Sequence, residues 1–369
     1  RSTLPPAARA ALSAARRHRI RTQLAAYGPA LPAGAVDCTV AYVDGTLAEL
    51  QRLEARTREE EAAGRTFGFF YVPVIAARVR IVRGELRYTL HPAGLEASLP
   101  WHSKRVGHFA EIFMPLLAAA AREYSFPDAD FLFGMTDEPA VCPEQRGGAR
   151  PPAPVLAWNS QRGCSAQVHF PGYDFFWTVA NFTPGAAWRF DTLTENEATP
   201  WDAKEPRAVF RGSSSGIPQR DELARRTRNC TDRSHVDCAV WPFDVGMVHG
   251  GQAGFLSAAQ QQRFKYVLDI DGYVSSLRLK NLLLSTMAVL RVESTSGNAQ
   301  FYDAELKAFE HYVPVSADLS DLEERVEWAR ANDAGARAVA EAGTRFAYER
   351  LSLQDVWEYE RAVLEELGA

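Results

Sequence analysis

The sequence predicts an α/β fold with two domains. Helical stretches alternate with short apolar strands through the first half of the chain, which is the pattern of a largely parallel sheet covered by helices. The alternation stops near Pro200 to Pro206, where proline and charge interrupt it, and starts again with the strand Ala208–Phe210. The length of 369 residues supports two domains, because one hydrophobic core rarely extends beyond about 250 to 300 residues.

Four segments are expected along the chain. Residues 1–75 are alanine-rich and charged, which predicts packing or stem helices. Residues 76–203 form the first α/β domain, which opens with a two-stranded flap because apolar and polar residues alternate on both sides of Arg83-Gly84-Glu85. Residues 204–345 form the second α/β domain. Residues 346–369 end the chain with a helix whose apolar residues share one face, and we expect it to cross back to the first domain.

Composition excludes several classes of protein. Hydrophobic residues make up 46% and charged residues 24%, and the net charge of −5 gives no general attraction to nucleic acid. The longest apolar stretch, Ile112–Ala121, contains Pro115 and falls short of the about 20 residues that a bilayer requires, so no membrane span is expected. The chain begins at Arg1 rather than at a methionine, which leaves room for a signal peptide or membrane anchor upstream.

The cysteines indicate a compartment rather than a metal site. None of the 5 cysteines forms a CxxC pair or a Cys/His spacing that suits zinc. Cys230 and Cys238 lie close enough in sequence to close a small loop, and Asn181 and Asn229 begin glycosylation sequons. These features favour an oxidising secretory compartment, although two sequons often arise by chance in a chain of this length.

A phosphate-binding pattern follows the apolar run Lys265–Ile270. Asp271-Gly272 ends this run. Ser275-Ser276 is expected to cap a helix whose first turns carry Arg278 and Lys280. Because a helix N-terminus with cations beside it attracts phosphate, the pattern predicts an anion site. An ordinary buried βα unit with one exposed basic residue explains the segment alone equally well.

A second small-residue loop, Phe210–Gly216, comes directly after a strand and before Pro218, which suits the first turn of a helix. Small residues allow backbone N–H groups to approach an anion, while hydroxyl and guanidinium groups add hydrogen bonds and charge. Its candidate ligands are Arg211, Gly212, Ser213, Ser214 and, in the helix that follows, Arg220. Two such loops in one α/β domain strengthen the prediction of a diphosphate site.

Carboxylates follow two of the predicted strands. The strand Phe131–Phe133 runs into Asp137 and Glu138, and the carboxyl ends of strands are where open α/β sheets bind ligands. Asp137 is the candidate general base and Glu138 its competitor, unless both merely end a turn. Asp269 and Asp271 form a DxD pair that can hold a metal ion, although capping the glycine turn and orienting the nearby arginine is the favoured interpretation.

Five short blocks resemble, in order and spacing, glycosyltransferase family 90, which includes protein O-glucosyltransferases and capsule-associated xylosyltransferases. The blocks are Phe210–Ser213, Gln219–Asp221, Lys265–Gly272, Ser276–Lys280 and His311–Val315. The resemblance covers roughly Phe131 to the C-terminus. It implies an inverting, metal-independent transferase of the GT-B type, with two Rossmann-like domains facing a central cleft.

The resemblance also implies roles for particular residues. The C-terminal domain would bind a UDP-sugar, with Arg211 and Arg278 on the diphosphate, and Asp137 would act as the base on the acceptor hydroxyl. The remaining candidate donor-binding residues are Gly212, Ser213, Ser214, Arg220, Asp271, Gly272, Lys280 and, after the strand Ala288–Val292, Glu293. Asp271 stands where the animal protein O-glucosyltransferases tend to carry arginine, so a polysaccharide acceptor fits as well as a protein acceptor.

The expected function is therefore the transfer of glucose or xylose from a UDP-sugar to a hydroxyl of a protein or glycan. No cofactor and no metal are expected besides the donor, and the expected location is the lumen of the Golgi or endoplasmic reticulum. Two alternatives stay open. One is a non-catalytic glycan-binding or partner-recruiting protein of the same fold, and the other is a metal-dependent transferase that uses Asp269 and Asp271.

Overall fold

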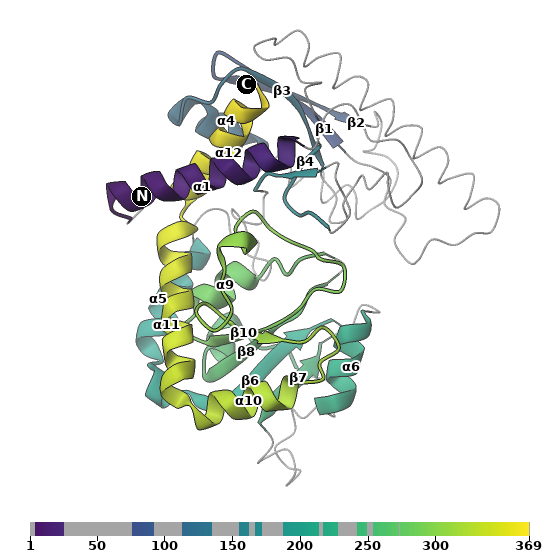
Figure 1. Ribbon diagram of the computed structural model, residues 1–369, viewed down its shortest axis with the longest axis vertical. Helices are drawn as coiled ribbons and strands as arrows, with labels where there is room; N and C mark the ends of the chain where they lie inside the picture. The colour runs from purple at the N-terminus through teal and green to yellow at the C-terminus, as the bar shows by residue number, and fades with distance from the viewer. Residues whose placement is uncertain are drawn as a thin grey trace, which may run out of the picture. The chain divides into compact units, whose positions relative to one another are not determined.

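The computed structural model divides the chain into two compact units (Figure 1). The N-terminal unit contains residues 4–176, 299–301 and 353–369, and the central unit contains residues 177–298 and 302–352. The structure describes residues 4–25, 76–91, 113–134, 155–161, 167–171, 187–213, 217–227, 242–248, 254–272 and 274–368. The expected division into four segments has other bounds than these two units and stays a prediction. Most of the expected helical region before residue 76 lies outside the described residues.

The N-terminal unit contains a mixed sheet of five strands in the order β2-β1-β3-β4-β5. Its strands are β1 (Ala76–Val82), β2 (Glu85–His91), β3 (Ala129–Gly134), β4 (Val155–Ala157) and β5 (Gln167–His169). β3, β4 and β5 are parallel, whereas β1 is antiparallel to both β2 and β3. The sheet is thus only partly parallel, and a mixed sheet with helices is consistent with the expected α/β class.

The expected hairpin is present, but it is not a separate flap. Arg83 (φ 51°) and Gly84 (φ 77°) form its two-residue turn, and two positive φ angles in succession match the twist of the strands they join. Because β1 also pairs with β3 along Ala76–Ile81, the hairpin forms the outer part of the five-stranded sheet.

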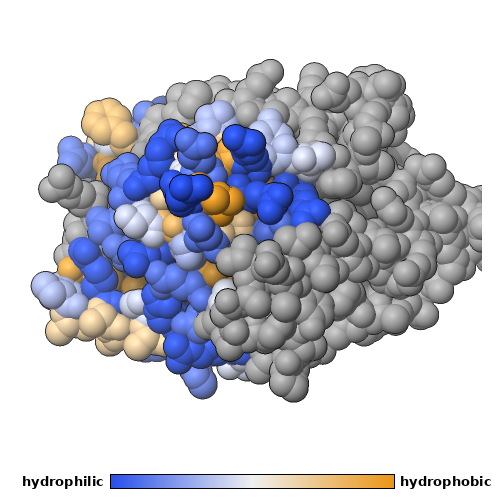
Figure 2. All heavy atoms as spheres, turned by 90° about the horizontal axis from the view of Figure 1, so that it is seen from above, coloured by the Kyte–Doolittle hydropathy of each residue, from blue (hydrophilic) through white to orange (hydrophobic). Residues whose placement is uncertain are grey.

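Three described helices belong to the N-terminal unit: α1 (Pro6–Ala25), α4 (Met114–Glu123) and α12 (Leu353–Leu367). The C-terminal helix α12 packs along α1, where Arg17 pairs with Glu365 and Arg21 lies 2.6 Å from Glu366. Seen from above, the described residues on the face where these helices lie are mostly hydrophilic (Figure 2). None of the described helices combines the length and the apolar character needed to cross a bilayer.

The central unit is built on a fully parallel sheet in the order β10-β9-β8-β6-β7. The strands are β6 (Glu205–Gly212), β7 (Phe243–Met247), β8 (Phe264–Asp269), β9 (Ala288–Val292) and β10 (Val313–Val315). The helices are α5 (Ala187–Ala198), α6 (Pro218–Thr227), α8 (Ala258–Gln261), α9 (Leu279–Leu284), α10 (Leu322–Ala331) and α11 (Asp333–Arg350). Short 3₁₀ turns span Trp201–Ala203 and Asp303–Glu305.

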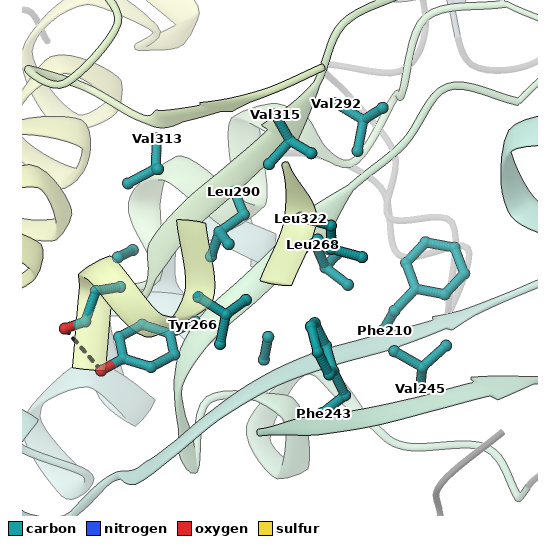
Figure 3. Close-up of a cluster of buried hydrophobic side chains, with 14 of the residues drawn as sticks. Phe210, Phe243, Val245, Tyr266, Leu268, Leu290, Val292, Val313, Val315 and Leu322 are labelled. Carbon is teal, nitrogen blue, oxygen red and sulfur yellow. Dashed lines mark hydrogen bonds between the residues drawn. The ribbon is translucent and has the colours of Figure 1, made fainter. Parts of the chain in front are cut away.

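The core of the central unit lies between this sheet and its helices (Figure 3). Strand residues such as Phe243, Leu268 and Leu290 are fully buried, as expected for parallel strands that helices cover. The hydroxyl of Tyr266 donates a 3.0 Å hydrogen bond to the carbonyl of Ala329 in α10, so the one polar group of this buried ring is satisfied.

Candidate functional site

The strand order of the central sheet reverses between β6 and β8. After β6 the chain adds β7 on one side, and then returns to add β8, β9 and β10 on the other. In open parallel sheets, ligands bind at the carboxyl ends of the strands beside such a reversal. Arg211 and Gly212 end β6, and Asp269 ends β8, so two segments predicted to bind an anion meet at this edge.

Two arginines from different elements lie over the ring of Phe210. The guanidinium of Arg278 is 4.7 Å from the ring centroid and that of Arg220 is 5.7 Å from it. Gly212 is required here, because a Cβ atom at this position would approach Phe210 Cζ to 2.8 Å. The ring, the glycine and the two cations therefore form one packed group at the end of β6.

Arg220 and Arg278 connect the loops that follow β6 and β8. Arg220 Nε donates to Asp271 O at 2.9 Å, and its Nη1 donates to Ser213 O at 2.8 Å. Arg278 donates from Nη1 to Arg211 O at 2.9 Å and from Nη2 to Leu268 O at 3.0 Å. Burial lowers the pKa of Arg278, and the nearby Asp269 opposes this shift.

Arg211 is bound by its own chain. Its Nη2 lies 2.5 Å from Asp244 Oδ1 on β7, and its Nη1 donates to the carbonyls of Phe210 (2.9 Å) and Asp244 (2.8 Å). Its Nε donates to Gly254 O at 3.2 Å. All three guanidinium nitrogens are thus engaged, and the side chain is 7% exposed.

The two aspartates of the DxD pair hold the turn after β8. Ser276 Oγ donates to Asp269 Oδ1 at 2.5 Å, and Ser276 N donates to Asp271 Oδ1 at 3.2 Å. Asn298 Nδ2 donates to Asp271 Oδ2 at 3.1 Å. Burial raises the pKa of both carboxyls, that of Asp271 to about 6. Among the described residues, no group of three His, Cys, Asp or Glu side chains is arranged to hold a metal ion.

The expected cap at Ser275-Ser276 is wrong. The helix α9 begins at Leu279, with Arg278 at the N-cap position. The physical reason is that Ser276 donates hydrogen bonds to the two preceding aspartates, from its backbone N–H to Asp271 and from its hydroxyl to Asp269. Ser276 therefore stabilises the turn after β8 and does not cap the helix. The other expected helix start is confirmed, because α6 begins at Pro218.

The remaining candidate residues lie in different environments. Lys280 is 2% exposed, and its ammonium donates to Leu277 O at 2.7 Å, so the structure places it in the interior. Glu293 follows β9 with an exposed side chain, and its carbonyl accepts from Gln219 Nε2 at 3.0 Å. Gly272 N donates to Val274 O at 3.0 Å. Asp137 and Ser214 lie outside the described residues.

Sequence reasoning missed three residues of this group: the Phe210 ring, Asp244 and Asn298. Asp244 offered a signal, because an acidic residue inside the apolar strand of β7 needs a partner when buried. Phe210 begins the family block Phe210–Ser213 but was not a candidate for the site, and Asn298 gave no signal, since an asparagine in a loop is ordinary.

The fold and the site define a class: an α/β protein with a parallel sheet and a group of arginines at its strand-order reversal, where open α/β sheets bind ligands. Residues 104–369 match the family model described as glycosyl transferase family 90. The chain belongs to this family, as the five sequence blocks predict.

Curated relatives extend this result. The chain is 27% identical over 261 residues to protein O-glucosyltransferase 2 of Danio rerio, which covers 70% of this chain and 50% of the relative. It is 28% identical over 255 residues to protein O-glucosyltransferase 3 of Homo sapiens, covering 68% of this chain and 48% of that protein. It is 27% identical over 246 residues to protein O-glucosyltransferase 1 of Rattus norvegicus, covering 63% and 61%. The chain thus spans about half or somewhat more of the length of these relatives.

Proposed function

We propose that this chain transfers a sugar, glucose or xylose, from a UDP-sugar to a hydroxyl of a protein or glycan, with inversion at the anomeric carbon. The observation that carries the proposal is the pair of arginines over Phe210 at the carboxyl edge of the central sheet, in a chain that belongs to glycosyl transferase family 90. The names of the relatives favour glucose as the sugar and a protein as the acceptor.

The proposed reaction is a direct displacement. Asp137 takes the proton of the acceptor hydroxyl, whose oxygen forms a bond to the anomeric carbon while the bond from that carbon to the UDP oxygen breaks. The electron pair leaves with UDP. Arg278 and Arg220 stabilise the negative charge that develops on the diphosphate, Arg211 fixes the end of β6 beside them, and Glu293 reaches the ribose.

We extend the proposal to a metal-independent reaction in a GT-B arrangement of two Rossmann-like domains. Two observations support it: both carboxylates of the DxD pair accept hydrogen bonds from their own chain, and each of the two units has its own sheet with parallel strands. The two sequons support the lumen of the secretory pathway as its location.

The test is release of UDP from four donors: UDP-glucose, UDP-xylose, UDP-galactose and UDP-glucuronate. We expect turnover with glucose or xylose, unaffected by EDTA. Asp137→Asn should lower turnover at least ~100-fold with the affinity for UDP preserved, because the base acts on the acceptor and not on the nucleotide. The matched control is Glu138→Gln, which removes the neighbouring carboxylate and should retain activity.

Each part of the proposal has its own contrary result. A near-wild-type rate for Asp137→Asn would remove that residue from the mechanism. Activity that EDTA abolishes and Mn²⁺ restores would revive the metal-dependent alternative. Binding of UDP without turnover of any donor would favour the non-catalytic glycan-binding protein.

A further inference from the structure

Phe210 is the common contact of two cations that come from different parts of the chain. It is fully buried in β6, and Figure 3 shows its ring as part of the core cluster of the central sheet. Arg220 comes from α6 and Arg278 from the turn after β8, and both guanidinium groups lie over this one ring. Both guanidinium groups thus contact the same side chain, Phe210.

The ring offsets part of the cost of holding two cations close together. Arg278 bonds two carbonyl oxygens, which orient the guanidinium without neutralising it. An aromatic face carries negative potential and attracts a guanidinium that lies within about 6 Å. Burial lowers the pKa of Arg278, and the charge of nearby Asp269 opposes this shift. An anion bound beside the pair would act in the same direction as Asp269.

The same ring also packs against the backbone of Gly212 at the end of β6. The position of a Cβ atom on Gly212 would lie 2.8 Å from Phe210 Cζ and 3.6 Å from Arg220 Nη1. The ring therefore lies directly against the glycine where an anion is expected to approach the backbone. Replacing the ring by a smaller side chain would remove a contact that both arginines and the glycine share, while the hydrogen bonds of the arginines to backbone carbonyls stay.

We infer that Phe210 is a positioning residue of the donor site, whose ring sets where Arg220 and Arg278 meet the diphosphate. The inference rests on the proposed function, since it concerns the same site. Phe210 does not touch the donor in this scheme. It acts through the two guanidinium groups, so its loss should affect recognition of the diphosphate more than recognition of the rest of the nucleotide.

The experiment compares the affinities for UDP and UMP by isothermal titration calorimetry in the wild type, Phe210→Leu and Phe264→Leu. Phe264 is a buried phenylalanine (4% exposed) at the first residue of β8, remote from the carboxyl edge, and serves as the matched control for core damage. We expect Phe210→Leu to weaken UDP at least about tenfold and UMP less than about threefold, because two cation–π contacts are lost. Phe264→Leu should bind both nucleotides as the wild type does.

Two results overturn the inference. One is an unchanged ratio of UDP to UMP affinity in Phe210→Leu, whether both affinities are retained or both fall together. The other is an equal change of that ratio in Phe264→Leu. A wild type that binds no UDP is a different failure, because it refutes the proposed function regardless of Phe210. If Phe210→Leu does not fold, as circular dichroism would show, Phe210→Met fills the core with a flexible side chain and the same criteria apply to it.

Discussion

Asp271 is a residue whose charge changes with pH just below neutrality. Its carboxylate is held by Ser276 and Asn298, and burial raises its pKa from 3.8 to about 6. Between these two values the folded protein keeps a proton that the unfolded chain has lost, so this group lowers stability as pH rises from about 4 to 6. A pKa that differs by about 2 between the folded and unfolded states changes the free energy of unfolding by on the order of 3 kcal/mol.

Asp271→Asn removes this titration. The free energy of unfolding of the variant, minus that of the wild type, should therefore increase between pH 4.5 and 7, as measured by urea denaturation. Asp321→Asn is the matched control. Burial raises the pKa of Asp321, but hydrogen bonds from Ser316 and Arg325 outweigh burial and lower it. The difference in the free energy of unfolding between this variant and the wild type should therefore stay constant over this range. A flat difference for Asp271→Asn would show that its carboxyl is already ionised at pH 4.5.

At the scale of elements, a buried ion pair connects β7 to β6 in addition to the parallel backbone pairing of the two strands. Asp244 on β7 is 5% exposed and lies 2.5 Å from Arg211 and 3.8 Å from Arg207, both on β6. Asp244 thus pairs with two buried cations of β6, and a buried cation that loses a charged partner is costly.

Asp244→Asn should lower the free energy of unfolding by about 3 kcal/mol, since Arg211 would stay buried after losing the charge of Asp244. Glu222→Gln on α6 is the control. Its partners Arg225 and Arg226 form a surface cluster with it, and losing a surface ion pair should cost far less than losing a buried one. Chemical denaturation measures both, and similar losses for the two variants would contradict a structural role for the buried pair.

The sequence predicts elements where local chemistry decides them. The hairpin turn at Arg83-Gly84 follows from a glycine between alternating strands, and α6 begins at Pro218 because proline suits a first helical turn. The start of α9 was not predictable this way, because Ser276 bonds Asp269 and Asp271 instead of the helix. Pairing of β1 with β3 depends on contacts about 50 residues away in sequence, which no local pattern carries.

At the scale of the whole molecule, the N-terminal unit is assembled from three separate stretches of sequence. One side chain links two of these stretches. His169 Nδ1 accepts from Gln23 Nε2 of α1 at 3.0 Å, and its Nε2 lies 2.6 Å from Ser160 Oγ and 3.1 Å from Ala299 O. A family resemblance predicts two α/β domains, but only the folded chain shows that residue 299 joins the N-terminal unit.

This contact network predicts how the unit responds to acid. Burial lowers the pKa of His169 from 6.5 to about 4, with Arg19 acting in the same direction. Between these values the unfolded chain binds a proton that the folded protein excludes, so His169 makes the protein less stable as pH falls from 6.5 to 4, by on the order of 3 kcal/mol.

His169→Asn should reduce this acid sensitivity. The wild type should lose stability relative to the variant as pH falls from 7 to 4.5, even if the variant is less stable at pH 7 because it has lost contacts to Ser160 and Ala299. His18→Asn removes an exposed imidazole from α1 and is the matched control for the loss of a histidine from this unit. Thermal unfolding across this pH range measures all three proteins. Parallel curves for the wild type and His169→Asn would mean that the imidazole binds a proton as readily in the folded unit as in the unfolded chain. His169 would then not be the neutral group that contacts Gln23 and Ala299.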